Sequence, residues 1–222
     1  MKKNKTIAAF FDFDGTVYNG VVAFDFLIFL VRNNKFGLND IMELPALVCY
    51  YLMDKFNLIE RYELNKRLYQ KIKGQDSGLL ESMSKEFFKQ NVGKKLFPVM
   101  VNITQTHKKN GRKVVIVTSA LREIVNPVRK WVKIDDIIAT EVKVNKGIYT
   151  GIIKRLPVGK NRVQIIKKYC RDRNIDIKKS YAYSDHYSDM PLLENIGNPV
   201  AVNPDRKLRM NARKKNWKII DL

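Results

Sequence analysis

Phe10-Phe11-Asp12-Phe13-Asp14-Gly15-Thr16 is an apolar run that ends in two carboxylates, a glycine and a hydroxyl. Two later runs also end in residues able to bind phosphate, Val114-Val115-Ile116-Val117-Thr118-Ser119 and Tyr181-Ala182-Tyr183-Ser184-Asp185. Short apolar runs bounded by turn-forming residues are typical of strands buried in a parallel sheet. Because open α/β sheets place their active sites beyond the carboxyl ends of such strands, the three segments predict an enzyme that acts on phosphate groups.

The rest of the chain supports an α/β fold. From Lys94 onward, helical patterns alternate with strand-like segments, and we predict strands at residues 113–119, 136–140, 181–184, 200–203 and 217–221. This alternation predicts a Rossmann-like, doubly wound parallel sheet. The alternating run over residues 140–152 is interrupted by Asn145-Lys146-Gly147 and therefore predicts a β-hairpin.

An inserted segment separates the first strand from the others. From Val21 to about residue 90 the apolar residues recur at helical spacing, so we predict a helical cap domain over residues 19–93, inserted into a catalytic core of residues 1–18 and 94–222. Its two apolar patches, Val21–Val31 and Leu44–Met53, fall short of the roughly 20 residues that a membrane span requires. They are either the inner faces of a helical bundle or a lid that binds an apolar substrate or a membrane surface.

The composition is that of a globular and strongly basic protein. Its 222 residues are 45% hydrophobic, enough for a real core, and 42 Lys and Arg residues outnumber 22 Asp and Glu. From Lys143 onward the ratio is 19 to 7. The excess is either a solvated surface or a field that attracts polyanions, anionic lipid headgroups or small phosphorylated substrates.

The few cysteines and histidines bear on the cellular compartment and on which residues could bind a metal. Cys49 and Cys170 lie far apart without a CxxC spacing, which indicates free thiols in a reducing compartment and predicts a cytoplasmic protein. The only histidines are His107 and His186, so a histidine metal site is not expected. His186 lies between two acidic residues and is either a surface residue or one that touches the substrate.

The paired carboxylates predict a metal ion. Strand geometry puts Asp12 and Asp14 on the same side, and two such close carboxylates both stay ionised only beside a cation or strong donors. Oxygen ligands favour Mg²⁺, which takes one or two carboxylates together with waters and substrate phosphate. Asp185 and Asp189 follow another strand end. We therefore predict that the four carboxylates surround one metal pocket.

Four motifs in order resemble those of the haloacid dehalogenase superfamily of phosphatases. They are Phe11-Asp12-Phe13-Asp14-Gly15-Thr16, Thr118-Ser119, a basic residue within Gly159-Lys160-Asn161-Arg162, and Ser184-Asp185 followed by Asp189. The segments Tyr183–Leu193 and Gly197–Asp205 resemble the phosphoserine-phosphatase-like branch, subfamily IB. The resemblance covers nearly the whole chain and implies a Rossmann-like core with a helical cap that closes over the site.

The resemblance also implies a role for each motif residue. Asp12 is expected to attack phosphorus and become an aspartyl-phosphate. Asp14 is expected to protonate the departing alkoxide, then deprotonate water, and to bind Mg²⁺ through its backbone carbonyl. Ser119 and the Ala120 amide are expected to hydrogen-bond the phosphoryl oxygens where a helix begins. Thr16 is expected to stabilise the loop or to contact phosphate.

The third and fourth motifs leave one choice open. Lys160 has the commoner residue type for the motif-three cation, whereas Arg162 has the better helical phase, although apolar residues at Ile165, Ile166 and Tyr169 would direct it away from the buried face. Asp185 is expected to bind the metal directly. Asp189 is expected to act through water or by orienting the cation.

These residues predict a Mg²⁺-dependent phosphomonoester hydrolase that acts on a small phosphorylated metabolite. A phosphotransferase or a lipid-phosphate hydrolase of the same fold is the alternative, and a basic nucleic-acid-binding protein with vestigial motifs is the alternative of another class. We expect no stable nucleic-acid partner and no transmembrane segment.

The substrate is less determined than the reaction. Phosphoserine phosphatases carry a carboxylate for the substrate ammonium near the start of the insert, where this chain has Gly20-Val21-Val22-Ala23-Phe24. Asp25 could replace that acid only if its helix were rotated, and Arg61 or Arg67 could bind a substrate carboxylate.

Overall fold

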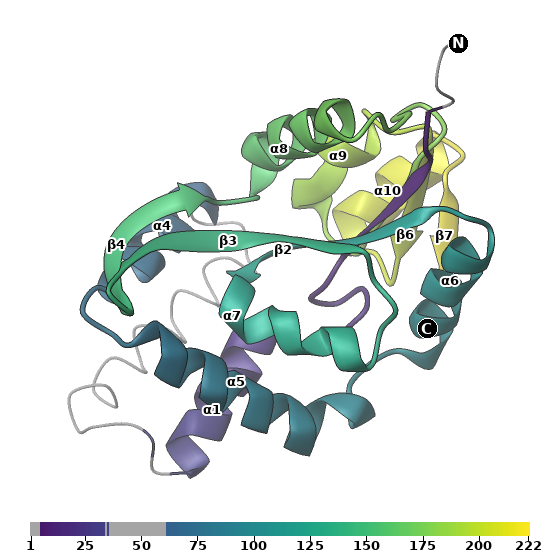
Figure 1. Ribbon diagram of the computed structural model, residues 1–222. Coiled ribbons are helices and arrows are strands. Elements are labelled where there is room, and N and C mark those ends of the chain that lie inside the picture. The colour runs from purple at the N-terminus through teal and green to yellow at the C-terminus, as the bar shows by residue number, and fades with distance from the viewer. Residues whose placement is uncertain (1–4, 34, 36–60) are drawn as a thin grey trace.

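The computed structural model describes residues 5–33, 35 and 61–222, and these residues form a seven-stranded sheet between two helical layers (Figure 1). The strand order is β4-β3-β2-β1-β5-β6-β7, and all neighbours are parallel except the β3–β4 pair. The strands are β1 (Ala8–Asp12), β2 (Lys113–Leu121), β3 (Asp136–Asn145), β4 (Ile148–Arg155), β5 (Tyr181–Ser184), β6 (Asn198–Val202) and β7 (Lys218–Ile220). The predicted α/β, Rossmann-like doubly wound architecture is confirmed.

Helices cover both faces of this sheet. They are α1 (Val22–Arg32), α4 (Arg61–Lys71), α5 (Ser77–Asn91), α6 (Pro98–Lys109), α7 (Arg122–Val125), α8 (Gly159–Asp172), α9 (Met190–Leu193) and α10 (Arg206–Lys214). In Figure 1, α8, α9 and α10 lie above the sheet, whereas α1, α5 and α7 lie below it. Adjacent strand residues point to opposite layers, so Phe10 packs under α8 and α10 while Phe11 packs with the other layer.

The central strands are apolar because both of their faces are buried. Phe10 and Phe11 have no exposed surface, and Phe11 stacks on Tyr183 with ring centroids 4.4 Å apart. A fully buried phenylalanine contributes roughly 1.5–3 kcal/mol, so these strands provide much of the stabilisation that holds the site-bearing loops. Such continuous apolar runs made the strands readable from the sequence.

His107 is a core residue. Among the described residues, it belongs to no group of His, Cys, Asp or Glu side chains that could hold a metal ion. Its ring is 3% exposed, and its Nε2 lies 2.8 Å from the hydroxyl of Tyr183. Burial, together with the nearby charge of Arg112, lowers the pKa of His107 to about 4. The side chain is therefore neutral at pH 7.

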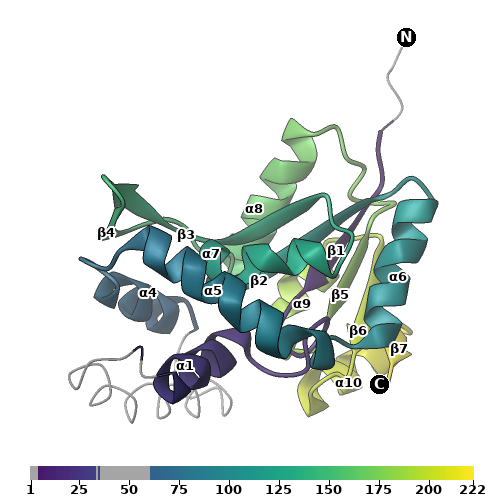
Figure 2. The same cartoon turned by 60° about the horizontal axis from the view of Figure 1, so that its bottom comes forward.

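The predicted hairpin is present as β3 and β4. Its turn residues Lys146 and Gly147 have φ values of 46° and 82°, the left-handed conformation that a tight hairpin turn requires. β3 continues past the predicted end at residue 140 because the same strand first pairs with β2 and then forms the hairpin. The hairpin thereby projects beyond the central sheet toward α4 and α5 (Figure 2).

Backbone hydrogen bonds attach the inserted segment to this hairpin. The amide of Gly74 donates to the carbonyl of Tyr149 (2.9 Å), and the amide of Tyr149 donates to the carbonyl of Gln75 (3.0 Å). The amide of Ser77 donates to the carbonyl of Gly147 (2.8 Å). The loop between α4 and α5 therefore extends the hairpin edge, a connection that the sequence pattern did not indicate.

The first apolar patch of the insert corresponds to α1. Val22, Phe26, Phe29 and Leu30 form its buried face, and Phe26 packs edge-on against Phe87 of α5, as the helical-bundle interpretation expects. The second patch, Leu44–Met53, lies outside the described residues. In the ranges that the structure describes, no helix is both long and apolar enough to cross a membrane.

Candidate active site

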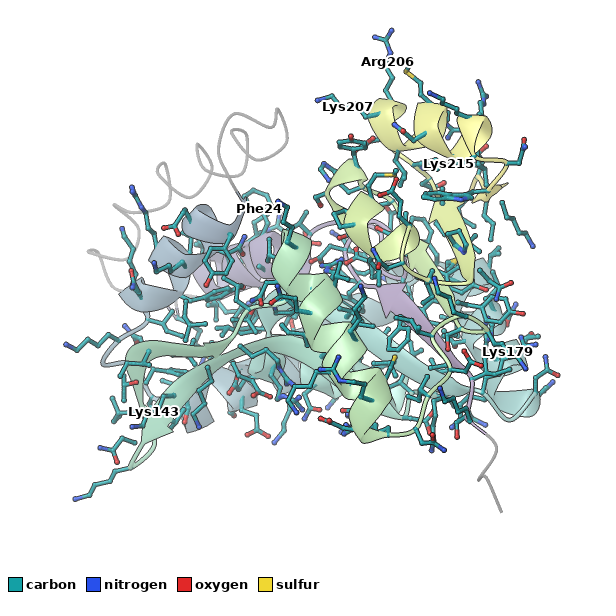
Figure 3. All side chains as sticks on the ribbon, turned by 90° about the horizontal axis from the view of Figure 1, so that it is seen from above. Phe24, Lys143, Lys179, Arg206, Lys207 and Lys215 are labelled. Carbon is teal, nitrogen blue, oxygen red and sulfur yellow. The ribbon has the colours of Figure 1, made fainter. Side chains whose placement is uncertain are left out.

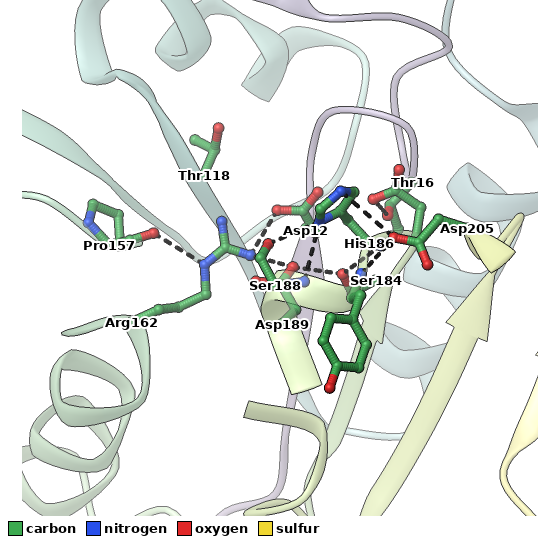
Figure 4. Close-up of polar contacts among 12 residues, drawn as sticks. Asp12, Thr16, Thr118, Pro157, Arg162, Ser184, His186, Ser188, Asp189 and Asp205 are labelled. Carbon is green, nitrogen blue, oxygen red and sulfur yellow. Dashed lines mark hydrogen bonds and ion pairs between the residues drawn. The ribbon is translucent and has the colours of Figure 1, made fainter. Parts of the chain in front are cut away.

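Three motif-bearing strands lie next to one another at the centre of the sheet. β1 pairs with β2 on one side and with β5 on the other, and the register places Asp12 beside Val117 and Phe11 beside Tyr183. The loops after these strands therefore leave the sheet at the same edge. As the sequence predicted, residues far apart along the chain meet there (Figure 4).

Arg162 is the cation of this cluster. Its Nη1 lies 2.9 Å from Oδ1 of Asp12 and 2.6 Å from Oδ2 of Asp189, and its Nε donates to the carbonyl of Pro157 at 3.0 Å. The side chain is only 6% exposed, whereas Lys160 is exposed. The structure thus places Arg162, and not Lys160, against the carboxylates.

The expectation that Arg162 would point away from the buried face is wrong. Arg162 lies in the first turn of α8, which begins at Gly159 directly after the buried loop that contains Pro157. Arg162 shares one face of α8 with Ile166 and Tyr169, and all three are buried, so helical phase directs the guanidinium inward. The buried guanidinium is stable because two carboxylates and a carbonyl accept hydrogen bonds from it.

The electrostatics of Asp12 follow from its surroundings. Burial raises the pKa of its carboxyl, Arg162 opposes that shift, and the charges of Asp189, Asp185 and Asp14 add to it, so that the pKa lies well above the ordinary value. Because burial disfavours the ionised form, Arg162 is needed to keep Asp12 charged. Asp189 accepts a further hydrogen bond, from the Ser184 hydroxyl at 2.5 Å, and is itself buried.

The other two motif aspartates contact the loop after β1 and the start of α1. Oδ1 of Asp14 accepts the Val22 amide at 2.7 Å, so this carboxylate faces the amino end of α1. Oδ1 of Asp185 accepts the Thr16 hydroxyl at 3.3 Å. A Cβ added at Gly15, whose φ is +74°, would lie 2.1 Å from Oδ2 of Asp185. A glycine is therefore required where this carboxylate packs on the loop backbone.

The four carboxylates do not form a common ligand group. No set of three or more His, Cys, Asp or Glu side chains is arranged to hold a metal anywhere in the described part of the chain. Asp189 is engaged by Arg162 and Ser184, and Asp14 by the Val22 amide. The charges of Asp14, Asp185 and Asp189 nevertheless act on Asp12, and the metal pocket that the four residues would surround stays a prediction.

A smaller set of oxygens still suits Mg²⁺. Asp12 and Asp185 supply two carboxylates, and the tight packing of Asp185 against Gly15 brings its oxygens to the peptide that bears the Asp14 carbonyl. Mg²⁺ is commonly bound through one or two carboxylates, with waters and substrate phosphate completing the octahedron. This donor set fits that preference.

The second motif differs from the sequence expectation. β2 continues through Leu121 and α7 begins only at Arg122, so no helix starts at Ser119. The amide of Ala120 donates to Oγ1 of Thr118 at 3.1 Å. Ser119 therefore does not cap a helix. A register irregularity between Val117 and Leu121 separates this segment from regular strand geometry.

Thr118 is the first residue of the second motif, but it was not among the residues predicted to bind phosphate. It follows Val117, the register partner of Asp12, and it is drawn with the Asp12–Arg162 cluster in Figure 4. Its position was readable, because the apolar run Val114–Val117 ends at Thr118 just as the first run ends at Asp12.

Tyr69 brings the inserted segment to the same edge. Its hydroxyl donates to the Ser119 carbonyl at 2.6 Å, and the Thr140 hydroxyl donates to the same oxygen at 2.6 Å. Burial and the nearby Asp14 carboxylate raise the pKa of Tyr69, so its hydroxyl keeps its proton. Helical spacing predicted packing for Tyr69, but it could not reveal this polar contact with the core.

The other candidate residues have local partners or lie away from the cluster. His186 accepts the Ser188 amide at 3.1 Å and so caps the short 3₁₀ turn Tyr187–Asp189. Its Nε2 lies 3.5 Å from Oδ2 of Asp205. Arg67 is exposed, and the side chain of Arg61 lies outside what the structure describes.

Comparisons with known proteins identify the family. The sequence profile of the haloacid dehalogenase-like hydrolases matches residues 9–194. Phosphoserine phosphatase SerB1 of Mycobacterium tuberculosis is 27% identical over 218 residues, which cover 97% of this chain and 71% of that protein.

Solved structures share the fold. A protein of unknown function from Bordetella pertussis superposes with a TM-score of 0.87 at 22% identity, over 98% of this chain and 99% of that one. A phosphoserine phosphatase in the form of a phospho-aspartyl intermediate analogue superposes with a TM-score of 0.68 at 15% identity, over 98% and 94%. Together with the profile match, these likenesses show that the chain belongs to the haloacid dehalogenase-like hydrolase family, as a phosphatase of the phosphoserine-phosphatase-like kind.

Proposed function

We propose that this chain is a Mg²⁺-dependent phosphomonoesterase that works through an aspartyl-phosphate on Asp12. The observation that carries the proposal is the buried Arg162 guanidinium between Asp12 and Asp189, at the edge where β1, β2 and β5 end. A nucleophilic carboxylate needs a nearby cation to stay ionised when buried, and the phosphoryl group needs positive charge around its oxygens.

The side chains divide the reaction between them. Asp12 attacks phosphorus and releases the alcohol, and water then hydrolyses the acyl phosphate, so that one hard displacement becomes two easier ones. Asp14 gives a proton to the departing oxygen and later takes one from the attacking water. Arg162 stabilises the charge on the phosphoryl oxygens. Bound Mg²⁺, held by Asp12, Asp185 and the Asp14 carbonyl, would neutralise the same oxygens.

Thr118 is our candidate for the hydroxyl that binds the phosphoryl group, with Ser119 as the alternative. Thr118→Ala is expected to lower kcat/KM by about 10²-fold, because one phosphoryl donor is lost from a desolvated site. Ser119→Ala, which keeps the backbone carbonyl that Tyr69 and Thr140 contact, is expected to lower it less than about threefold. Steady-state kinetics on p-nitrophenyl phosphate decide between them, and the reverse order of effects would return the role to Ser119.

The surroundings of α1 bear on the substrate. Asp25 is the acidic residue of α1, and its carboxylate accepts the Tyr18 hydroxyl and pairs with Lys95. It is therefore not positioned as the carboxylate that would bind a substrate ammonium. We propose a small phosphorylated metabolite as substrate, and the contacts of Asp25 give no support for phosphoserine.

The cap limits and the cellular location are parts of the proposal. We propose a catalytic core of residues 1–18 and 94–222 and a cap of residues 19–93. The Tyr69 hydroxyl, which contacts the Ser119 carbonyl, connects the cap to the core. A cap over the site would keep bulk water from the acyl phosphate.

A cytoplasmic location is supported by the buried free thiol of Cys170.

The basic surface favours no polynucleotide partner. Lys143, Lys179 and the α10 residues Arg206 and Lys207 are exposed and project from separate parts of the surface, not from one stripe (Figure 3). Lys215, beside α10, pairs with Glu194 at 3.1 Å. A positive field attracts small phosphorylated anions, and we keep the expectation that the chain has no stable nucleic-acid partner.

Removal of the metal tests the function most simply. Hydrolysis of a panel of phosphomonoesters is expected to fall at least about 10³-fold in EDTA and to return with added Mg²⁺, because the charge on the phosphoryl oxygens would otherwise be opposed by Arg162 alone. The panel includes phosphoserine and a detergent-dispersed lipid phosphate, and the latter tests the lipid-phosphate alternative. An alcohol added to the reaction as an acceptor tests the phosphotransferase alternative. Full activity in EDTA, or salt-sensitive polynucleotide binding without turnover, would contradict the proposal.

A further inference from the structure

Two connections join the inserted segment to the core, and they lie side by side. Residue 18 pairs with Leu96 in an antiparallel bridge. The Asn19 amide donates to the Lys95 carbonyl at 2.7 Å, and the Phe97 amide donates to the Val17 carbonyl at 3.0 Å. The outgoing and returning segments therefore form one short double-stranded link between core and insert.

Asp25, in the first turn of α1, bonds to both strands of that link. Its Oδ2 accepts the Tyr18 hydroxyl at 2.8 Å, and its Oδ1 lies 2.8 Å from Nζ of Lys95. The Lys95 ammonium also lies 5.9 Å from the centre of the Tyr18 ring. Tyr18 is fully buried, and burial and the Asp25 carboxylate raise its pKa, so the hydroxyl keeps its proton and donates. We call these three residues the Tyr18–Asp25–Lys95 clamp.

Gly20 shows how closely the clamp is packed. Its φ is +141°, and a Cβ at this position would lie 2.9 Å from Oδ2 of Asp25 and 3.4 Å from the Tyr18 ring. The turn before α1 therefore passes directly against the carboxylate. This packing fixes where the first turn of α1 lies with respect to the loop after β1.

The first turn of α1 is also the part of the helix that touches Asp14. The N-cap residue Val21 provides no side-chain cap, and the Val22 amide instead donates to Oδ1 of Asp14 at 2.7 Å. An amide at a helix start is a good partner for a carboxylate because it would otherwise lack an acceptor within the helix. The orientation of Asp14 thus depends on the placement of α1.

We propose that Tyr18, Asp25 and Lys95 are positioning residues for Asp14, because the clamp fixes α1 and thereby aims the Val22 amide that holds the Asp14 carboxylate. The inference rests on the proposed function, in which Asp14 donates a proton to the leaving group. Loosening the clamp weakens the Val22 contact that helps to orient this carboxylate. The loss then falls on substrates whose leaving oxygen must be protonated, and spares those with a stable leaving anion.

The test compares two substrates in one variant. Asp25→Asn is expected to lower kcat/KM for an alkyl phosphate, whose alkoxide needs a proton, by at least about tenfold. For p-nitrophenyl phosphate, which leaves as a stable phenolate, the expected decrease is less than about threefold. Because kcat/KM covers only the steps up to release of the alcohol, the ratio of the two substrates isolates the proton donor. Equal losses on both substrates would overturn the proposal.

Asp135→Asn is the matched control. The Asp135 side chain is 18% exposed and the Asp25 side chain 17%, and Asp135 pairs with Lys108 at 2.7 Å. Asp135 directly precedes β3, and its carboxylate accepts the Val114 amide near the amino end of β2. Its loss tests for general destabilisation and is expected to leave the substrate ratio unchanged. Lys95→Arg, which keeps the charge, is expected to retain most of the alkyl phosphatase activity, whereas Lys95→Met is expected to behave like Asp25→Asn.

Amide hydrogen exchange measures the clamp without any activity. In Asp25→Asn the Val22 amide is expected to exchange at least about tenfold faster while the amides of β1 keep their protection, because only the start of α1 is released. An unchanged exchange rate of the Val22 amide in Asp25→Asn would contradict the proposed role of the clamp, whatever the activity of the variant. If wild type hydrolyses neither ester, the proposed function fails, while the exchange result still judges the clamp. Should Asp25→Asn not fold, Tyr18→Phe removes only the donor hydroxyl and is measured in the same way.

Discussion

Asp12→Asn is expected to lower kcat for p-nitrophenyl phosphate by at least about 10⁴-fold, the scale of loss when an enzyme loses its nucleophile. An amide oxygen does not attack phosphorus as a carboxylate does, so no acyl phosphate forms. The fold should survive, because asparagine has the same shape and removes a charge whose burial is unfavourable. Burial raises the pKa of the Asp12 carboxyl, and the charges of Asp189, Asp185 and Asp14 raise it further.

The control for this variant is Asp172→Asn, which removes an exposed carboxylate paired with Lys168 at 2.7 Å on α8. It is expected to keep wild-type kcat. Circular dichroism melts of both variants separate a loss of chemistry from a loss of folding. Wild-type turnover by a folded Asp12→Asn protein would remove Asp12 from the reaction.

Among the substitutions, Arg162→Met has the second-largest expected effect, because it removes the shared partner of two buried carboxylates. Breaking a buried ion pair costs about 3–5 kcal/mol, so the melting temperature should fall clearly. Loss of the charge beside the phosphoryl oxygens should lower kcat by about 10²–10³-fold. Arg162→Lys should recover part of the stability, although a single ammonium cannot reproduce the three contacts to Asp12, Asp189 and the Pro157 carbonyl.

Lys160→Met is the matched comparison, since it removes the competing motif-three cation two residues earlier. Lys160 is exposed, so activity and melting temperature should change little. Thermal melts and steady-state kinetics on the three variants check this. A larger loss in Lys160→Met than in Arg162→Met would show that the phosphoryl cation is the lysine.

The parts of the fold that the sequence predicted are those that local patterns determine. β1, β2 and β5 were readable because strands buried on both faces are apolar throughout. The hairpin was readable because Asn145-Lys146-Gly147 is a turn sequence with a glycine where φ is positive. The junction of the insert with this hairpin was not, because backbone hydrogen bonds between distant segments leave no residue pattern.

The site shows the same division. Placing Asp12 at a strand end required only the apolar run before it. Asp189 contacts Arg162, which agrees with the prediction that it orients the cation, whereas the contact of the Asp14 carboxylate with the Val22 amide was not predicted. Val22 and Arg162 lie in the first turns of α1 and α8, so their contacts depend on where these helices begin relative to the strand ends. The helical phase of Arg162 was informative, but its face, shared with Ile166 and Tyr169, is the buried one and not the exposed one as we had expected.

The most direct test of the account is to trap the phosphorylated chain. Enzyme mixed with a ³²P-labelled substrate and Mg²⁺ is quenched in acid, digested, and its labelled peptide sequenced. The account predicts an acid-stable, hydroxylamine-sensitive label on the peptide containing Asp12, absent from Asp12→Asn and present in Asp172→Asn. A label on another residue, or an unlabelled chain during rapid turnover, would contradict it.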